Sequence, residues 1–249
     1  VQFFEKLYSN QGDVHIDESF FDHCPKLSDV QSRILARPLC VAELLSTVGS
    51  CSDSCPGRDG IPYSFYREFS DLLLPLVLKS WEFSLRVGKL PKSQSLSCIT
   101  VIPKQGKDSR YLRNWRPIAV SACDLKIITK ALSIRVAKVL PDIISSSQMG
   151  FVPGRDINFN NRILRYIVQN HDKFSENVIA SFDAEKAFDS VSHDYLIRVL
   201  QTYGFPAAFI KMFRLLYNGN TAIIQVHGHL SKEFKLQRGV KQGDALSCS

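Results

Sequence analysis

The stretch "SFDAEKAFDSV", residues 181–191, directly follows the apolar run "NVIA" and places Asp183, Glu185 and Asp189 within seven positions. The apolar residues predict a buried strand over 177–183, with a helix-rich segment after it. A carboxylate at the end of a buried strand is unfavourable unless it is paired, hydrogen-bonded or bound to a cation. Asp183 therefore either binds a hard cation such as Mg²⁺, which needs few carboxylates, or caps the following turn while the other two carboxylates face solvent.

The chain has the size and composition of a globular protein. Its 249 residues are 45% hydrophobic, which is enough to bury a core in one large or two small domains. The longest aliphatic stretch, "LLLPLVL" at 72–78, is far shorter than the roughly 20 residues of a membrane-spanning helix. The first residues, "VQFFEKLYSN", lack the basic segment and apolar core of a secretion signal. We therefore expect no membrane partner.

The cysteines indicate a reducing compartment. There are 7 of them, an odd number, with neither a C-x-x-C pair nor the second half of a zinc pattern. This usage predicts reduced thiols in an intracellular protein of the nucleus or the cytoplasm. The chain lacks an initiating Met and ends at "LSCS", so we expect it to be a fragment.

The net charge of +7 is unevenly distributed. Residues 1–85 hold 7 Lys and Arg against 12 Asp and Glu, whereas residues 86–116 hold 8 Lys and Arg against Asp108 alone. A concentrated basic segment is what a polyanion-binding surface needs, because each neutralised phosphate releases counterions. The alternative is a solvated loop whose charge keeps the protein soluble.

The remaining patterns predict a mixed fold without internal repeats. Apolar residues at helical spacing favour a helix over 62–88, interrupted at Pro75, and another over about 122–140 that Ser121 caps. Two short β-rich runs predict strands on either side of a basic loop. These two strands cover residues 97–103 and 116–120. The other expected elements are helices over 157–170, 194–203 and 206–217, and a hairpin over 221–239 that turns at "HGHLS".

Longer motifs resemble one enzyme family. The block "SFDAEKAFDSVSHDYL" is similar to the first catalytic block of reverse transcriptases of the non-LTR (LINE-type) retrotransposons. Other blocks surround it in the order of that family: "PGRDGIPYSFYREF" (56–69), "LPKSQSLSCITVIPKQGKDSRYLRNWRPIAV" (90–120), "SSSQMGFVPGRDI" (145–157) and "RGVKQGDALS" (238–247). The resemblance covers about residues 41–249, and group II intron maturases are relatives with the same fold.

The resemblance implies an α+β, right-hand polymerase fold. Residues 56–249 would form the reverse transcriptase domain, with fingers over about 56–174 and a partial palm over about 175–249. An acidic, helical N-terminal extension would occupy residues 1–55. In similar polymerases a later hairpin carries a paired-aspartate motif, and no "DD" occurs in these 249 residues. We therefore expect a domain truncated before that hairpin, with the carboxylate partner of Asp183 beyond the end of the chain.

The resemblance also implies a metal site and a sugar-selecting residue. Asp183 matches the metal-binding, catalytic aspartate of the first block, and the main-chain carbonyl of Ala184 would face the same ion. Phe188 matches the aromatic residue under the sugar of the incoming nucleotide, where it crowds a 2′-hydroxyl. Without the surrounding block, Phe188 reads as an ordinary core residue.

Further residues match the nucleotide-binding positions of the family. Lys104 and Arg116 would contact the triphosphate, for which a point charge and a guanidinium fork are chemically suited. Gln242 and Gly243 match the "QG" that shapes the nucleotide pocket, and Arg155 resembles a residue that lines the substrate or template path. We expect Asp183 and Gln242 to converge on one pocket, with Phe188 between the strand end and that pocket.

Asp244 and Ala245 depart from the family, which often has a small or sulfur-containing residue and then proline after "QG".

The implied function is RNA-directed DNA polymerase, working by two-metal nucleotidyl transfer with Mg²⁺, or Mn²⁺ as the alternative. The implied partners are an RNA template, a DNA primer, deoxynucleoside triphosphates and an endonuclease domain in the same polyprotein. The fragment by itself would be inactive. Two other hypotheses stay open, a decayed element without a functional enzyme and a noncatalytic RNA-binding module.

Overall fold

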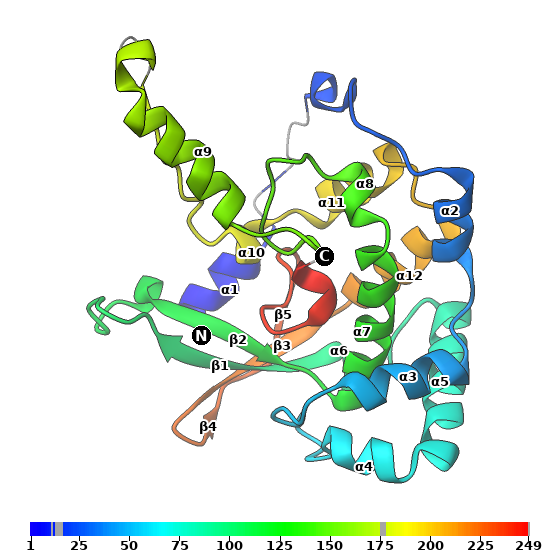
Figure 1. Cartoon of the computed structure of the whole chain (residues 1–249). Helices are drawn as coiled ribbons and strands as arrows, with labels where there is room; N and C mark the ends of the chain where they lie inside the picture. Colours follow the sequence, from blue (N-terminus) through cyan, green and yellow to red (C-terminus); the bar gives the residue numbers. More distant parts are fainter. Residues whose placement is uncertain (11, 13–16, 175–177, 249) are drawn as a thin grey trace.

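The computed structural model describes residues 1–10, 12, 17–174 and 178–248 (Figure 1). Strands form a mixed sheet in the order β2-β1-β3-β4, and β5 pairs with β3 as well. Their bounds are β1 Leu96–Pro103, β2 Trp115–Val120, β3 Thr221–Val226, β4 His229–Leu230 and β5 Phe234–Lys235. Together with the helices described below, they confirm the mixed α and β content that the sequence predicts.

The centre of the sheet is β1, which pairs antiparallel with β2 and parallel with β3. Both predicted strands of this hairpin are confirmed, and each begins one residue earlier than expected. The basic loop between them, residues 104–114, ends in the short 3-10 helix η2, Leu112–Asn114. The loop lies at the end of the hairpin, on the left of Figure 1.

A helical layer surrounds α7, Cys123–Ala137, on the right of Figure 1. Apolar side chains on several of its faces are buried, as expected for a helix enclosed by others. Helices α2 and α3 pack directly against it, and α5 and α12 belong to the same core. The bounds in this layer are α2 Asp29–Ala36, α3 Val41–Ser50, α4 Tyr63–Glu68, α5 Ser70–Val87, α8 Leu140–Ile143, α11 His193–Thr202 and α12 Ala207–Tyr217.

Two details of the predicted helices are wrong. The interruption within 62–88 lies at Phe69, between α4 and α5, whereas α5 continues through Pro75. Pro75 is inside α5, so the helix lacks the one hydrogen bond that an N–H at residue 75 would have donated to the carbonyl of Asp71. Ser121 does not cap α7, because its Oγ lies 3.4 Å from Oγ of Ser97 on β1 and the N-cap residue is Ala122.

A second, smaller core joins the N-terminal helix α1, Gln2–Tyr8, to the sheet. Phe4 and Tyr8 are buried together with Ile99, Ile224 and Phe234. Helix α1 also packs against α10, Ala187–Ser190, which lies beside it in Figure 1. The first residues of the chain therefore lie next to residues near position 190 and near position 234.

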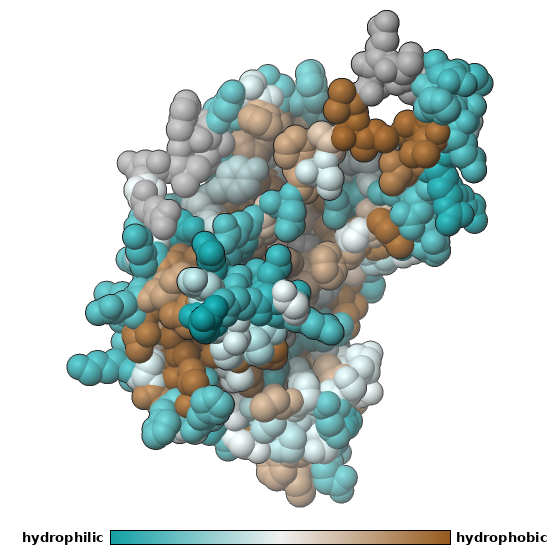
Figure 2. All heavy atoms as spheres, turned by 90° about the vertical axis from the view of Figure 1, so that its left-hand side faces the viewer, coloured by the Kyte–Doolittle hydropathy of each residue, from teal (hydrophilic) through white to brown (hydrophobic). Residues whose placement is uncertain are grey.

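Helix α9, Asn158–Gln169, projects from the body of the molecule as an arm (Figure 1). None of its residues is buried. Figure 2 shows apolar side chains gathered along the arm at the upper right. Those exposed by at least 45% include Phe159, Ile163, Leu164, Tyr166 and Val168.

The strand predicted over 177–183 is wrong. Residue 177 lies outside the described part of the chain, and residues 178–184 have neither helix nor strand structure. Val178 and Phe182 are 89% and 93% exposed, so this apolar run is not buried. A strand needs a neighbour to which its backbone can bind, and no described strand pairs with this run.

The remaining elements agree with the sequence or are short. The hairpin after α12 is confirmed, with a tighter turn at His227 and Gly228, which both have positive φ as a two-residue hairpin turn requires. Short helices complete the chain: η1 Glu18–Phe21, α6 Lys92–Ser95, η3 His171–Phe174 and η4 Ala245–Cys248. Across the described residues, every helix is too short or too polar to cross a membrane.

Candidate functional site

A cavity of about 440 Å³ lies where the β1–β2 hairpin, the segment around α10 and the loop of residues 238–244 meet. It brings together all the candidate residues except Arg155. Asp183 and Gln242 line the same cavity with Phe188, as expected from the order of the motifs. The lining residues are Lys104, Trp115, Arg116, Pro117, Asp183, Ala184, Lys186, Ala187, Phe188, Asp189, Lys241, Gln242, Gly243, Ser247 and Cys248.

The loop of residues 238–244 is held against both neighbouring segments by main-chain contacts. The carbonyl of Gln242 accepts a 2.8 Å hydrogen bond from the N–H of Ala119 on β2, and the N–H of Val240 donates to the Phe188 carbonyl at 2.8 Å. Gly239 has φ +83°, and a Cβ there would lie 2.6 Å from the Asp189 carbonyl oxygen. Only glycine tolerates both the positive φ and this close approach, so the loop stays close enough to complete the cavity.

Asp183 reaches the cavity from an exposed, irregular segment. Asp183 and Ala184 both line the cavity. A carboxylate and a main-chain carbonyl are the kinds of oxygen donor that suit a hard divalent cation, which keeps waters and binds phosphates. No group of three or more His, Cys, Asp or Glu residues suited to a metal occurs in the part of the chain that the structure describes. A cation at this site would therefore take only some of its ligands from the described residues and the others from water or phosphate.

Asp189 is a functional candidate that sequence reasoning missed. It is 1% exposed, although one interpretation of the motif placed it in solvent. One carboxylate oxygen accepts a 2.7 Å hydrogen bond from the Tyr8 hydroxyl, and the other accepts a 3.1 Å bond from Nε2 of Gln242. Burial raises the pKa of Asp189, while the Tyr8 hydrogen bond and the charges of Lys186 and Lys104 act in the opposite direction.

Cations outnumber carboxylates around the cavity. Lys104, Arg116, Lys186 and Lys241 line it. Burial lowers the pKa of Lys241, and the nearby Asp244 carboxylate partly offsets this. A cluster of lysines with one arginine is suited to a polyphosphate, which presents several anionic oxygens at once.

Asp244 does not line the cavity, although it follows the "QG" motif directly. Its carboxylate is buried and accepts hydrogen bonds from the Thr129 hydroxyl on α7 and the main-chain N–H of Leu246, each 2.9 Å long. Burial raises the pKa of Asp244, and the hydrogen bond from Leu246 and the charge of Lys241 lower it. This departure from the family therefore anchors the loop to α7.

Arg155 lies apart from the cavity and is engaged by the main chain. Its guanidinium donates to the carbonyls of Pro141, Ile144 and Gln148 at 2.8–2.9 Å, and also to the carbonyl of Ser145. These bonds organise the loop between α8 and α9. These contacts give Arg155 a structural role in this loop, and its expected place along a substrate or template path stays a prediction.

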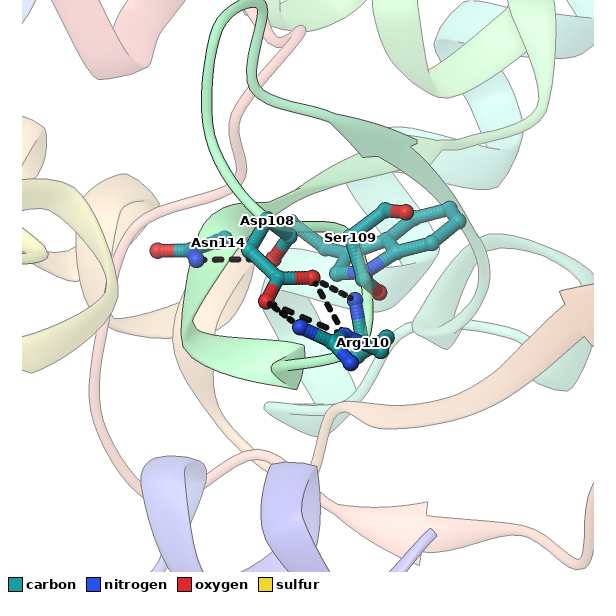
Figure 3. A network of polar contacts seen from close by, with 5 residues as sticks. Asp108, Ser109, Arg110 and Asn114 are labelled. Atoms are coloured by element: carbon teal, nitrogen blue, oxygen red, sulfur yellow. Dashed lines mark hydrogen bonds and ion pairs between the residues drawn. The ribbon is translucent and has the colours of Figure 1, made fainter.

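The basic loop of residues 104–114 is also internally organised (Figure 3). Arg110 pairs with Asp108 at 2.8 Å, and the Asn114 side chain donates to the Asp108 carbonyl at 2.8 Å. The hydrogen bond from Arg110 lowers the pKa of Asp108. The ion pair is solvent-exposed, so it orders the loop but contributes little to stability.

Comparison with known proteins agrees with this geometry. Residues 102–249 match the family described as reverse transcriptase (RNA-dependent DNA polymerase). The chain is 32% identical over 232 residues to the transposon TX1 uncharacterized 149 kDa protein of Xenopus laevis, covering 92% of this chain and 18% of that protein. It is 33% identical over 197 residues to the retrovirus-related Pol polyprotein from the type-2 retrotransposable element R2DM of Drosophila melanogaster, covering 78% of this chain and 18% of the relative.

A third relative is named as a probable RNA-directed DNA polymerase from transposon BS of Drosophila melanogaster. It is 23% identical over 221 residues, which cover 87% of this chain and 24% of that protein. The chain thus spans about a fifth of the length of these relatives. The family match covers more than half of the chain and contains every residue that lines the cavity. The chain belongs to the reverse transcriptase (RNA-dependent DNA polymerase) family, in the branch of the non-LTR retrotransposons.

Proposed function

We propose that this chain provides the nucleotide pocket of an RNA-directed DNA polymerase that works by nucleotidyl transfer. The observation that carries the proposal is the cavity where Asp183, Phe188 and Gln242 meet the cations Lys104 and Arg116. These residues come from separate segments and have the chemistry that a nucleoside triphosphate needs. A carboxylate can bind a metal ion, an aromatic ring can pack against a sugar, and Lys and Arg side chains can bind phosphates.

Each residue has a role in this proposal. Lys104 and Arg116 bind the triphosphate, and the Phe188 ring excludes a 2′-hydroxyl by its bulk. The carboxylate of Asp183 and the carbonyl of Ala184 would hold Mg²⁺, with Mn²⁺ as the alternative. When bound, the metal would activate the primer 3′-hydroxyl and stabilise the departing pyrophosphate.

The proposal extends to the division of the fold. Residues 56–174 would be the fingers, residues 175–249 part of the palm, truncated before the paired-aspartate hairpin, and residues 1–55 an acidic helical extension. The cavity then lies between fingers and palm, because Lys104 and Arg116 belong to the first part and Asp183 and Gln242 to the second. Helix α3 of the extension shares the core around α7 with the fingers.

The proposed substrates and partners follow from the same pocket. They are an RNA template, a DNA primer and deoxynucleoside triphosphates, with an endonuclease domain in the same polyprotein, in the nucleus or the cytoplasm. Two relatives carry "polyprotein" or "RNA-directed DNA polymerase" in their names, which supports this part of the proposal.

The chain by itself should bind nucleotide without extending a primer. Two-metal phosphoryl transfer needs carboxylates from more than one structural element. Among the described residues that line the cavity, Asp183 and Asp189 carry the carboxylates, and Asp189 is engaged by Tyr8 and Gln242. A second candidate function, noncatalytic RNA binding, is favoured by the exposed basic loop of residues 104–114.

The test uses Asp183→Asn in a polymerase-active protein that contains this chain. The substitution keeps the size of the side chain and removes the charge that attracts the metal, so primer extension should fall by at least about a hundredfold. Asp172→Asn, at an exposed position outside the cavity, is the matched control and should extend primers normally. Melting curves report whether each variant is folded. Normal extension by folded Asp183→Asn would refute the role of Asp183, and the proposal with it.

A further inference from the structure

A buried hydrogen-bonded chain connects the N-terminal helix to the candidate nucleotide pocket. Tyr8 on α1 donates to one carboxylate oxygen of Asp189 at 2.7 Å, and Gln242 donates to the other at 3.1 Å. Asp189 and Gln242 line the cavity, whereas Tyr8 lies behind it. The hydroxyl of Tyr8 therefore reaches the pocket through one intermediate side chain.

The carboxylate of Asp189 depends on these two donors. Tyr8 is 6% exposed and Asp189 is 1% exposed, so water has little access to their contact. A buried carboxylate that lacks hydrogen-bond donors is strongly unfavourable. Burial also raises the pKa of the Tyr8 hydroxyl, with the adjacent Asp189 carboxylate as the next cause, so Tyr8 remains a proton donor at neutral pH.

Tyr8 itself is held by the sheet. Its ring stacks on Phe234 of β5 with the ring centroids 6.4 Å apart, and its main-chain carbonyl accepts a 2.9 Å hydrogen bond from the N–H of Gln237. Phe4, one turn earlier on α1, is buried in the same cluster. The phenol hydroxyl is thus fixed relative to the strand that precedes the 238–244 loop.

This arrangement determines which end of the Gln242 amide faces the pocket. Each oxygen of the Asp189 carboxyl group accepts a hydrogen bond, and the oxygen beside Gln242 holds the NH₂ end of the amide. The carbonyl end, Oε1, is then left as an acceptor for a donor on the substrate. We infer that Tyr8 is a positioning residue for the nucleotide pocket, acting through Asp189 to fix the side-chain amide of Gln242; this inference rests on the proposed function.

The first test measures nucleotide KM and kcat in a polymerase-active protein that contains the chain. Tyr8→Phe removes one oxygen and should raise the KM for nucleotide about fivefold with little change in kcat, the size of one lost positioning hydrogen bond. In a Gln242→Ala background the same substitution should leave KM unchanged, because the group it positions is gone. The matched control is Tyr66→Phe, at a buried tyrosine on α4 that is remote from the cavity, and should leave KM unchanged.

A second test needs no activity, so it separates this inference from the proposed function. In the 249-residue chain, the side-chain amide resonances of Gln242, identified by their loss in Gln242→Glu, should shift in Tyr8→Phe and stay in place in Tyr66→Phe. Unchanged Gln242 resonances in Tyr8→Phe would overturn the inference. An equal KM rise with and without Gln242, or no rise at all, would overturn it as well. Normal primer extension by folded Asp183→Asn would instead refute the proposed function, while the Gln242 resonances would still report on this inference.

Discussion

Two carboxylates of one short motif, Asp183 and Asp189, have opposite surroundings. Asp183 lies on an exposed segment, where it is available to a cation, whereas Asp189 is buried between Tyr8 and Gln242. Asp189 is poorly placed to bind a metal, because it is buried and each of its oxygens already accepts a hydrogen bond from a protein side chain. Under the proposed function, Asp183 would bind the metal and substrate, whereas Asp189 connects Tyr8 to Gln242.

Phe188 allows a prediction about sugar selectivity. Phe188→Ala should still incorporate deoxynucleotides, at a reduced rate. Its discrimination against ribonucleotides should fall by about tenfold or more, because removal of the ring leaves room for a 2′-hydroxyl. The measurement is the ratio of kcat/KM for matched deoxy and ribo substrates in a polymerase-active protein that contains the chain. Phe182→Ala, at a fully solvent-facing neighbour in sequence, should leave that ratio unchanged. Equal selectivity in Phe188→Ala and the parent would identify Phe188 as a packing residue.

Among the elements, α9 stands out because its apolar side chains contact little of the described structure. Its apolar residues recur every three or four positions, as on one face of a helix, and the sequence therefore predicts this helix correctly. The helix nevertheless buries none of its residues, in contrast to α7. The stability of the molecule therefore resides in the α7 layer and not in the arm.

This contrast predicts unequal effects of substitution. Phe159→Gln on α9 should change the free energy of unfolding by no more than about 0.5 kcal/mol, because the ring is 56% exposed. Leu132→Ala on α7 should cost about 2–5 kcal/mol, because it leaves a cavity in the core. Urea unfolding of the 249-residue chain measures both. A loss of more than about 2 kcal/mol in Phe159→Gln would mean that α9 is packed in solution.

The elements that the sequence predicts well are those whose signal is local. Helix α7 and the strands β1 and β2 follow from periodicity and β-branched residues, and they occur within a few residues of the predicted bounds. The run 178–183 carries the same strand signal, yet it is irregular. Periodicity reports only that a segment could form a strand, whereas strand formation also needs a partner for its backbone groups.

For the whole molecule, the uneven charge distribution has a measurable consequence. The basic loop of residues 104–114 extends from the β1–β2 hairpin, and its first residue, Lys104, lines the cavity (Figure 1). Arg110 is already paired with Asp108 (Figure 3). Lys107, in the same loop, is exposed. These two cations should therefore contribute unequally to nucleic-acid binding.

We expect the chain to bind single-stranded RNA weakly and with steep salt dependence. Lys107→Gln should reduce the slope of log K against log salt by about 0.7, the value for one phosphate contact on a single strand. Arg110→Gln should reduce it less, because the Arg110 guanidinium is occupied by Asp108. Fluorescence titrations between low and moderate salt give the slopes. An affinity that does not depend on salt would exclude this loop as a phosphate-binding surface.

The candidate site was only partly accessible from the sequence. The order of the motifs predicts that Asp183, Phe188 and Gln242 converge, because the motifs that contain them would border one nucleotide pocket. The structure places all three residues in one cavity. The burial of Asp189 was missed, because its partner Tyr8 is 181 positions away and no local pattern links the two. The motif does contain a weak signal, because Asp189 directly follows the aromatic residue Phe188.

The docking of α1 has a consequence for how the protein is made. Helix α1 has 7 residues, too few for a helix to persist in isolation, and its partners lie around positions 190 and 235. A ribosome adds about 5–20 residues per second, so the N-terminal segment waits on the order of ten seconds or more before β5 and the following loop exist. During this interval Phe3, Phe4 and Tyr8 are exposed as an unstructured apolar peptide. Within residues 1–249, the pocket is therefore completed late, and α1 docks only after the segments that follow it have been made.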